Sequence, residues 1–200
     1  MKKGIASMLG LALAGFAGVA TAQTYVGVDY SSASYKERAN DQFGPRVPTL
    51  DLDQSALRVR AGVPLNRYFA VELHGSLGLS GDSQAEMIEY LGVIVDTEIE
   101  VELETALSAL LKARAPLGDR FGIFALLGYS RVDLGYDVRA SAEGIVETDS
   151  GSGSETGISM GGGAELRMSE RWHLNADYLQ LLDKSGVKIT SLNLGLRLDF

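Results

Sequence analysis

The sequence predicts an all-β fold, an eight-stranded antiparallel up-and-down barrel. Three observations predict it: strands that alternate apolar and polar residues, a short turn that recurs at nearly equal spacing, and no internal apolar stretch of helical length. The alternation is clearest at 188–200, where one parity is held by Leu192, Leu194, Leu196, Leu198 and Phe200. Because successive side chains of a strand point to opposite faces, this segment has one apolar face and one mostly polar face.

Residues 1–22 have the pattern of a cleaved secretory signal peptide, which leaves 23–200 as one barrel domain. Lys2 and Lys3 supply the charge, an apolar stretch follows, and A-T-A forms a small-residue cleavage site. A transmembrane helix is disfavoured, because the stretch is short, rich in Gly and Ala, and lacks stop-transfer charges. No later stretch reaches the ~18 apolar residues of a spanning helix. Export then leads to the periplasm, the medium or the outer membrane.

Composition excludes several kinds of partner and chemistry. The chain has 18 basic and 26 acidic residues, a net charge of −8, and loss of Lys2 and Lys3 makes it −10. An acidic chain does not suit nucleic acid, whose phosphates need a basic face. The chain has no cysteine, which excludes a disulfide scaffold and thiol catalysis.

One short turn occurs three times: P-L-N-R-Y-F at 64–69, P-L-G-D-R-F at 116–121 and M-S-E-R-W at 168–172. Each turn has an arginine followed by an aromatic residue, and the arginines lie 53 and 51 residues apart at Arg67, Arg120 and Arg171. Each interval has room for two strands, whereas a propeller blade needs about four. The repeat therefore predicts hairpins with short periplasmic turns and long extracellular loops, as in transmembrane barrels.

The strands follow in order if charges are kept off the lipid face, where Arg or Lys costs about 2–4 kcal/mol at mid-membrane. The expected strands are 24–32, 55–65, 68–79, 93–113, 121–138, 157–167, 172–182 and 188–200, with loops at 33–53 and 140–156. The fifth strand has an ambiguous register, and the repeat favours an outward set of Phe121, Ile123, Ala125, Leu127 and Tyr129. The turn end is expected to carry an aromatic girdle of Tyr25, Tyr68, Phe69, Phe121, Trp172 and Phe200.

The fourth strand is about twice the 9–11 residues needed to cross a bilayer. One parity, expected outward, holds Val93, Val95, Ile99, Val101, Leu103, Leu107, Ala109, Leu111 and Ala113. The other parity is acidic in its first half. Over 80–104 there are eight carboxylates and no Lys or Arg. We expect an acidic sheet that projects beyond the membrane, with Asp96, Glu98 and Glu100 as a recognition site for an extracellular protein ligand. The alternative is that these carboxylates only form a solvated, solubilising face.

The closing strand, which ends on Phe200, resembles the terminal strand of bacterial outer-membrane barrels, where this pattern is an assembly signal. The segment G-I-S-M-G-G-G-A-E-L-R-M-S-E-R-W-H-L-N-A-D-Y at 157–178 is similar to the outer membrane protein β-barrel domain family of small porin-like and opacity-type surface proteins. The resemblance implies an outer-membrane location, contact with membrane lipid and lipopolysaccharide, and recognition by the barrel-assembly machinery. It implies little about activity.

Inward positions of the expected strands collect opposite charges: Asp29, Arg58, Arg60, Glu72, Lys112, Arg114, Glu165, Arg167, Asp177 and Arg197. An eight-stranded barrel is just wide enough to be filled by side chains. We therefore expect a plugged interior of neutralised charges, and an ion-conducting or gated lumen is the alternative. A hairpin centred on Asn66 would set Arg60 beside Glu72.

No catalytic, cofactor or metal site is expected. Glu72, His74 and Ser76 have a spacing similar to the His-x-Ser of outer-membrane lipid A deacylases. However, they face inward near mid-membrane, whereas lipid A ester bonds lie nearer the outer surface. No helix follows the glycines at 161–163, so they form no phosphate loop. The acidic stretch 149–155 lacks the spacing of a calcium loop.

The favoured interpretation is a non-enzymatic outer-membrane barrel that interacts with something outside the cell, or stabilises the envelope, through its loops and protruding strands. Two alternatives are a small solute channel and a lipid A-modifying hydrolase.

The terminal pattern generates a prediction about assembly. Deletion of Phe200 should leave the chain in the periplasm and sensitive to protease, because the assembly signal would be incomplete. The measurement is heat-modifiable migration of the outer-membrane fraction together with protease sensitivity. Normal heat-modifiable migration of the truncated protein would contradict this prediction.

Overall fold

A computed structural model describes residues 24–37, 50–80, 82–90, 93–142, 145–184 and 186–200, with backbone and strand pairing alone for 37, 50–51, 82–90, 93–101, 138, 140–142 and 145–147. The expected signal peptide and much of the expected 33–53 loop lie outside these ranges. Within them, no helix is long and apolar enough to cross a bilayer.

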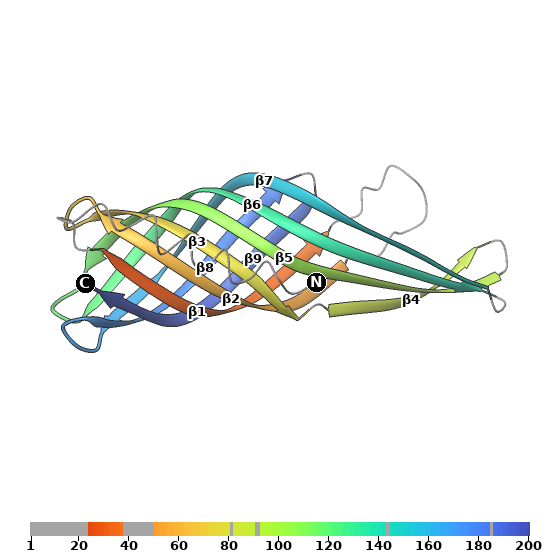
Figure 1. The fold of residues 1–200 in the computed structure, drawn as a ribbon, viewed down its shortest axis with the longest axis horizontal. Helices are drawn as coiled ribbons and strands as arrows, with labels where there is room; N and C mark the ends of the chain where they lie inside the picture. The colour runs from red at the N-terminus through yellow and green to blue at the C-terminus, as the bar shows by residue number, and fades with distance from the viewer. Residues whose placement is uncertain (1–23, 38–49, 81, 91–92, 143–144, 185) are drawn as a thin grey trace.

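All the regular structure in these ranges is strand (Figure 1). The elements are β1 Tyr25–Glu37, β2 Leu50–Pro64, β3 Phe69–Ser80, β4 Asp82–Tyr90, β5 Val93–Pro116, β6 Phe121–Ala142, β7 Ile145–Arg167, β8 Trp172–Lys184 and β9 Val187–Asp199. All pairings are antiparallel, and the ladder closes because β1 pairs with β9 and β3 pairs with β5. Both β3 and β4 pair with β5, one after the other, so they act as one interrupted strand. The prediction of a closed eight-stranded barrel is confirmed.

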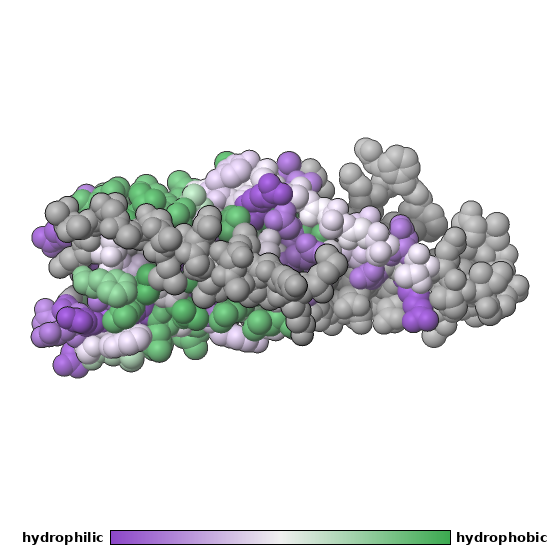
Figure 2. Space-filling model, in the orientation of Figure 1, coloured by the Kyte–Doolittle hydropathy of each residue, from purple (hydrophilic) through white to green (hydrophobic). Residues whose placement is uncertain are grey.

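An apolar band surrounds the part of the barrel next to the turns (Figure 2). The predicted register of β6 is confirmed, because Ile123, Leu127 and Tyr129 are exposed whereas Phe124 and Leu126 are buried. At the turn end the exposed aromatic side chains are Tyr68, Phe69, Phe121, Trp172 and Phe200. Tyr25 was wrongly placed in this girdle. It shares the inward parity of Asp29 and is buried in the barrel.

The three predicted turns close in the same way. Leu65 N donates to Phe69 O at 2.8 Å, Leu117 N to Phe121 O at 2.7 Å, and Met168 N to Trp172 O at 2.9 Å. This closure shifts the first hairpin from the predicted register. Glu72 pairs with Gly62 and Arg60 pairs with His74 across the ladder, so the expected Arg60–Glu72 neighbours are wrong by two residues.

A β-bulge at Glu104 reverses the two faces of β5. Leu103 pairs with Leu134 and Thr105 pairs with Asp133, which leaves Glu104 as the extra residue on β5. On the turn side of the bulge Leu107 is 47% exposed, whereas beyond it Leu103 is 3% exposed. The predicted outward orientation of Leu103 is therefore wrong, because an inserted residue switches every side chain beyond it to the opposite face. Two further bulges interrupt the β2–β3 and β8–β9 ladders.

The bulge adds Leu103 to the apolar side chains buried inside the barrel. The buried apolar cluster consists of Ala33, Ala56, Leu103, Ala106, Leu110, Phe124, Leu126, Val132, Leu179, Leu181, Leu182 and Ile189. Several of these, such as Ala33 on β1 and Ile189 on β9, lie farther from the turns than the charged inward residues of the same strands. The interior is therefore filled along its length: the charge network lies towards the turns, and the apolar cluster lies partly beside that network, as at Phe124, and partly beyond it.

Beyond the barrel, four strands continue as an open sheet, here called the extension, formed by residues 82–90, 93–103, 134–142 and 145–153. The pairing of β6 with β7 runs to Ala142 opposite Ile145, whereas β7 pairs with β8 only over Met160–Arg167. Figure 1 shows the extension tapering away from the barrel. Two predictions are corrected: within the expected 140–156 loop, residues 140–142 and 145–156 are strand, and 82–90 is also a strand. Neither strand could be recognised from an apolar pattern, because polar Gly/Ser-rich and acidic strands outside a membrane carry no apolar face towards lipid.

Side-chain hydrogen bonds of Asp133 connect the base of the extension to the barrel. Thr105 Oγ1 donates to Asp133 Oδ2 at 3.0 Å, and Arg131 Nε donates to Oδ1 at 3.1 Å. A hydrogen bond from Ser154, with those from Thr105 and Arg131, lowers the pKa of the Asp133 carboxyl. Asp133 therefore stays ionised and links neighbouring strands where the ladder is irregular.

The bulge can be tested with single cysteines, because the chain has none of its own. In protein folded into vesicles, Glu104→Cys should react with a water-soluble maleimide at least about tenfold faster than Leu103→Cys, which is accessible only when the structure opens locally. A lipid-borne quencher should reach a label at Leu107→Cys. Quenching of a label at Leu103→Cys by the same lipid would show that position 103 faces outward, as uninterrupted alternation predicts, and would contradict the bulge.

Candidate functional site

The first half of the buried charge network centres on Arg58. Its Nε donates to Asp29 Oδ2 at 2.9 Å and its Nη1 donates to Asp177 Oδ2 at 2.9 Å. Arg60 Nη2 lies 3.1 Å from Asp29 Oδ1, and Asn193 Nδ2 donates to Asp177 Oδ2 at 2.9 Å. All five side chains are buried, so each carboxylate holds a cation or amide inside the barrel instead of meeting water.

The second half centres on Glu72 and Lys112. Tyr25 Oη donates to Glu72 Oε1 at 2.6 Å, and Lys112 Nζ lies 3.3 Å from the same oxygen. Lys112 Nζ also donates to Glu165 Oε2 at 3.1 Å, and Arg197 Nη1 donates to that oxygen at 2.7 Å. The ammonium group of Lys112 therefore bridges two carboxylates on different strands.

The network is balanced in charge. Its buried members are four cations and four carboxylates, Arg58, Arg60, Lys112, Arg197, Asp29, Glu72, Glu165 and Asp177. Burial of ions is costly unless each is paired and hydrogen-bonded, and this arrangement pairs them across seven strands. Tyr25 and Asn193 also belong to the network and were not predicted as members. Both share a parity with residues predicted inward, which was the available signal.

Two predicted members lie at the rim of the barrel. Arg114 is partly exposed, with Nη1 3.8 Å from Glu165 Oε1 and Nε donating to the carbonyl oxygen of Arg67 at 2.9 Å. Arg167 is exposed and donates to the carbonyl oxygen of Asp119. Both stand within one or two residues of a turn, where the barrel opens. They therefore belong to the mouth at the turn end and not to the buried interior.

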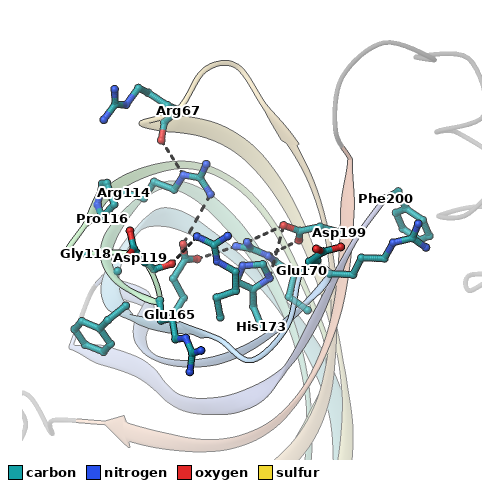
Figure 3. Close-up of a pocket in the computed structure, with 16 residues that line it drawn as sticks. Arg67, Arg114, Pro116, Gly118, Asp119, Glu165, Glu170, His173, Asp199 and Phe200 are labelled. Carbon is teal, nitrogen blue, oxygen red and sulfur yellow. Dashed lines mark hydrogen bonds and ion pairs between the residues drawn. The ribbon is translucent and has the colours of Figure 1, made fainter.

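That mouth is a cavity of about 550 Å³ lined by the rim arginines, Glu165, His173 and Asp199 (Figure 3). Arg197 closes its inner side, because its Nε donates to Asp199 Oδ1 at 2.7 Å while its Nη1 holds Glu165. In Figure 3 the side chain of Glu165 is directed into the mouth, whereas those of Arg67 and Phe200 are directed away from it.

The residues considered for nucleophilic catalysis lie within the wall of the filled barrel. His74 Nε2 lies 2.7 Å from Glu72 Oε2, and His74 and Ser76 are both buried. None of these three residues lines the mouth cavity. Among the described residues, no group of three or more His, Cys, Asp or Glu is placed to hold a metal ion.

The predicted recognition residues lie on the extension, described here by backbone register. Asp96 is opposite Ser141, Glu98 is opposite Arg139, and Glu100 is opposite Asp137. All three precede the bulge at Glu104 in the sequence, so they lie beyond the apolar band. The structure brings them to the second strand of the extension, between β4 and β6.

A closed antiparallel barrel with an apolar outer band, exposed aromatic side chains at its turn end and a filled polar interior is the architecture of an outer-membrane β-barrel protein. A family model confirms this class: the chain belongs to the outer membrane protein β-barrel domain family, whose model matches residues 4–200. The protein is therefore an integral protein of the bacterial outer membrane. The short turns face the periplasm and the extension faces outward.

Two solved structures illustrate the likeness. One is the attachment invasion locus protein Ail of Yersinia pestis in complex with the heparin analogue sucrose octasulfate, with 14% identity, coverage of 90% of this chain and 99% of that one, and a TM-score of 0.52. The other is OprG from Pseudomonas aeruginosa, with 12% identity, coverage of 90% and 96%, and a TM-score of 0.53. At these identities the likeness shows the fold alone. No curated protein sequence matches.

The network generates a prediction about stability. Glu72→Gln should lower the free energy of unfolding by about 3–5 kcal/mol, because it leaves Lys112 without one of its two carboxylates inside the barrel. The matched control, Glu170→Gln in an exposed turn, should change it by less than about 1 kcal/mol. Both are measured by urea titration of protein folded into vesicles.

A double-mutant cycle tests the corrected register. Lys112→Met combined with Glu72→Gln should cost less than the sum of the single changes, because the two side chains form an ion pair. Arg60→Met combined with Glu72→Gln should be closer to additive. The opposite ranking of the two coupling energies would mean that the originally predicted Arg60–Glu72 pair is correct.

Proposed function

We propose that this protein is a non-enzymatic surface-interaction protein whose extension binds an extracellular protein partner. The observation that carries the proposal is that β5, β6 and β7 continue in regular pairing past the barrel to Asp96, Ala142 and Ile145. The outer membrane requires only about 9–11 residues per strand, whereas these strands have 24, 22 and 23. The strand residues beyond those needed to cross the membrane are available for contacts outside the cell.

The extension has open edges that suit strand pairing with a partner. Within the described residues β4 pairs with β5 alone, and the outer part of β7 pairs with β6 alone. Unpaired backbone N–H and C=O groups on such edges can take up a strand of another chain, with specificity supplied by side chains. An open edge also invites self-association, which charged residues oppose.

The charge of the extension favours a basic partner. Its β5 segment carries Asp96, Glu98 and Glu100, and Glu102 follows on the same parity with an exposed side chain. The Ail structure contains a sulfated heparin analogue, but an acidic strand is unsuited to a polyanion. A basic peptide or protein segment is the class of ligand that we infer here.

Two alternatives are supported less well. A solute channel requires a continuous path, whereas the buried ion pairs around Lys112 are followed by the apolar cluster around Leu182. A lipid A-modifying hydrolase requires access to acyl esters, whereas Ser76 is buried beside the inner face of β2. Export through the N-terminal signal peptide and use of the barrel-assembly machinery are part of this proposal.

Replacement of Asp96, Glu98 and Glu100 with Ser tests the proposal. Purified protein in a zwitterionic detergent is titrated with deca-lysine and, separately, with sucrose octasulfate. We expect deca-lysine to bind the wild type, and the triple variant to bind it on the order of tenfold more weakly at about 0.02 M salt, with a smaller difference at about 0.3 M.

The control removes three carboxylates elsewhere, with Asp119, Glu170 and Asp183 changed to Ser. It should retain deca-lysine binding, because these residues lie in the turns or on β8. Equal losses in both triple variants, or tighter binding of sucrose octasulfate than of deca-lysine, would overturn the proposal. Ready cleavage between Val93 and Glu104 by protease added to intact cells would also overturn it.

A further inference from the structure

The three short turns share more than a closure. Each starts with an exposed apolar residue, Leu65, Leu117 or Met168, and ends with an exposed aromatic residue, Phe69, Phe121 or Trp172. Between them stands an exposed arginine, Arg67 at the third position of its turn and Arg120 and Arg171 at the fourth. Apolar, cationic and aromatic side chains therefore recur together at three places around the barrel.

These arginines are not members of the buried charge network. In the part of the chain that the structure describes, none of Arg67, Arg120 and Arg171 forms an ion pair, although Arg67 stacks on Tyr68 with its guanidinium carbon 4.6 Å from the ring centroid. Neighbouring Arg114 donates a hydrogen bond to the main-chain carbonyl oxygen of Arg67, and this contact leaves the guanidinium group of Arg67 unoccupied. Three cations thus remain available at one end of a chain whose net charge is −8.

The position of the turns identifies what surrounds them. They end the apolar band, and their aromatic residues lie at the level where lipid tails meet headgroups. An exposed Leu or Met in a turn is unfavourable in water but favourable where it reaches the boundary of the acyl region, and an adjacent arginine then lies among phosphates. The guanidinium fork matches two phosphate oxygens, and arginine is weakly hydrated, which suits this boundary.

We propose that Arg67, Arg120 and Arg171 form a collar that binds the phosphates of phospholipid headgroups in the periplasmic leaflet. Leu65, Leu117 and Met168 anchor each turn in the same leaflet. The side chain of Arg67 is directed away from the mouth of the barrel (Figure 3), which leaves it free to meet a headgroup. Asp119 and Glu170 precede two of the arginines and weaken the attraction, so the collar favours phosphate groups held in place by an inserted lipid over a free anion.

The test is native mass spectrometry of the full protein released from micelles that contain phosphatidylglycerol or phosphatidylcholine. The variant changes Arg67, Arg120 and Arg171 to Gln. Wild-type protein should retain phosphatidylglycerol, and the triple variant should bind it about fivefold more weakly at each of the three turns, because each turn loses one arginine. Heat-modifiable migration verifies that the variant is folded.

The matched control changes Arg139, Lys184 and Lys188 to Gln, which removes three cations at the opposite end of the barrel. It should retain phosphatidylglycerol like the wild type. Equal retention by wild type and collar variant, or an equal loss in the control, would overturn the proposal. Displacement of the lipid by inorganic phosphate at an equal concentration would also overturn it, because the turns would then bind a free anion and not a headgroup.

Discussion

The structure depends on one constraint: within lipid, every backbone N–H and C=O must find a partner in the protein. The β1–β9 and β3–β5 pairings meet it by closing the ladder. Closure at eight strands fixes a narrow interior, and a narrow interior that contains Arg58, Lys112 and their carboxylates must pair them. Beyond the apolar band water satisfies backbone groups, so closure is no longer required and β4 to β7 continue as an open sheet.

The same boundary explains the bulge. The largely apolar parity of β5, interrupted only by Thr97 and Thr105, continues from Ala113 to Val93 in the sequence, although the outside of the barrel changes from lipid to water along the strand. A regular strand would present Leu103 to water. One extra residue at Glu104 turns Leu103 to the interior, where it packs in the cluster with Ala106 and Val132. Exposed Glu102 and Glu104 then face water.

The barrel, the position of its turns and the inward parity of Asp29, Glu72 and Asp177 could be predicted from the sequence, because period-two alternation and the cost of charge in lipid are local signals. Individual partners could not be predicted. Glu72 contacts Lys112 from a strand about 40 residues away, and that contact depends on the register between β3 and β5, which no short turn joins. The strand at 145–156 was missed because its Gly and Ser residues follow no apolar pattern and are ordered only by pairing with β6.

The turns carry arginines and the extension carries carboxylates, and the position of the membrane explains this difference as well. At the periplasmic end the three turns between paired strands are short, so their side chains stay close to the membrane boundary, and arginine beside an aromatic residue fits both phosphate and the acyl boundary. At the outer end the strands extend beyond the membrane, where carboxylates keep an open sheet soluble. Exchange of these charges would place acids among lipid phosphates and would leave the open edge of β4 facing an anionic lipopolysaccharide surface with attractive charge. Under both proposals, the observed distribution of charge favours contact of the turns with lipid phosphates and keeps the extension away from the lipid surface, where its edges remain open to the proposed partner.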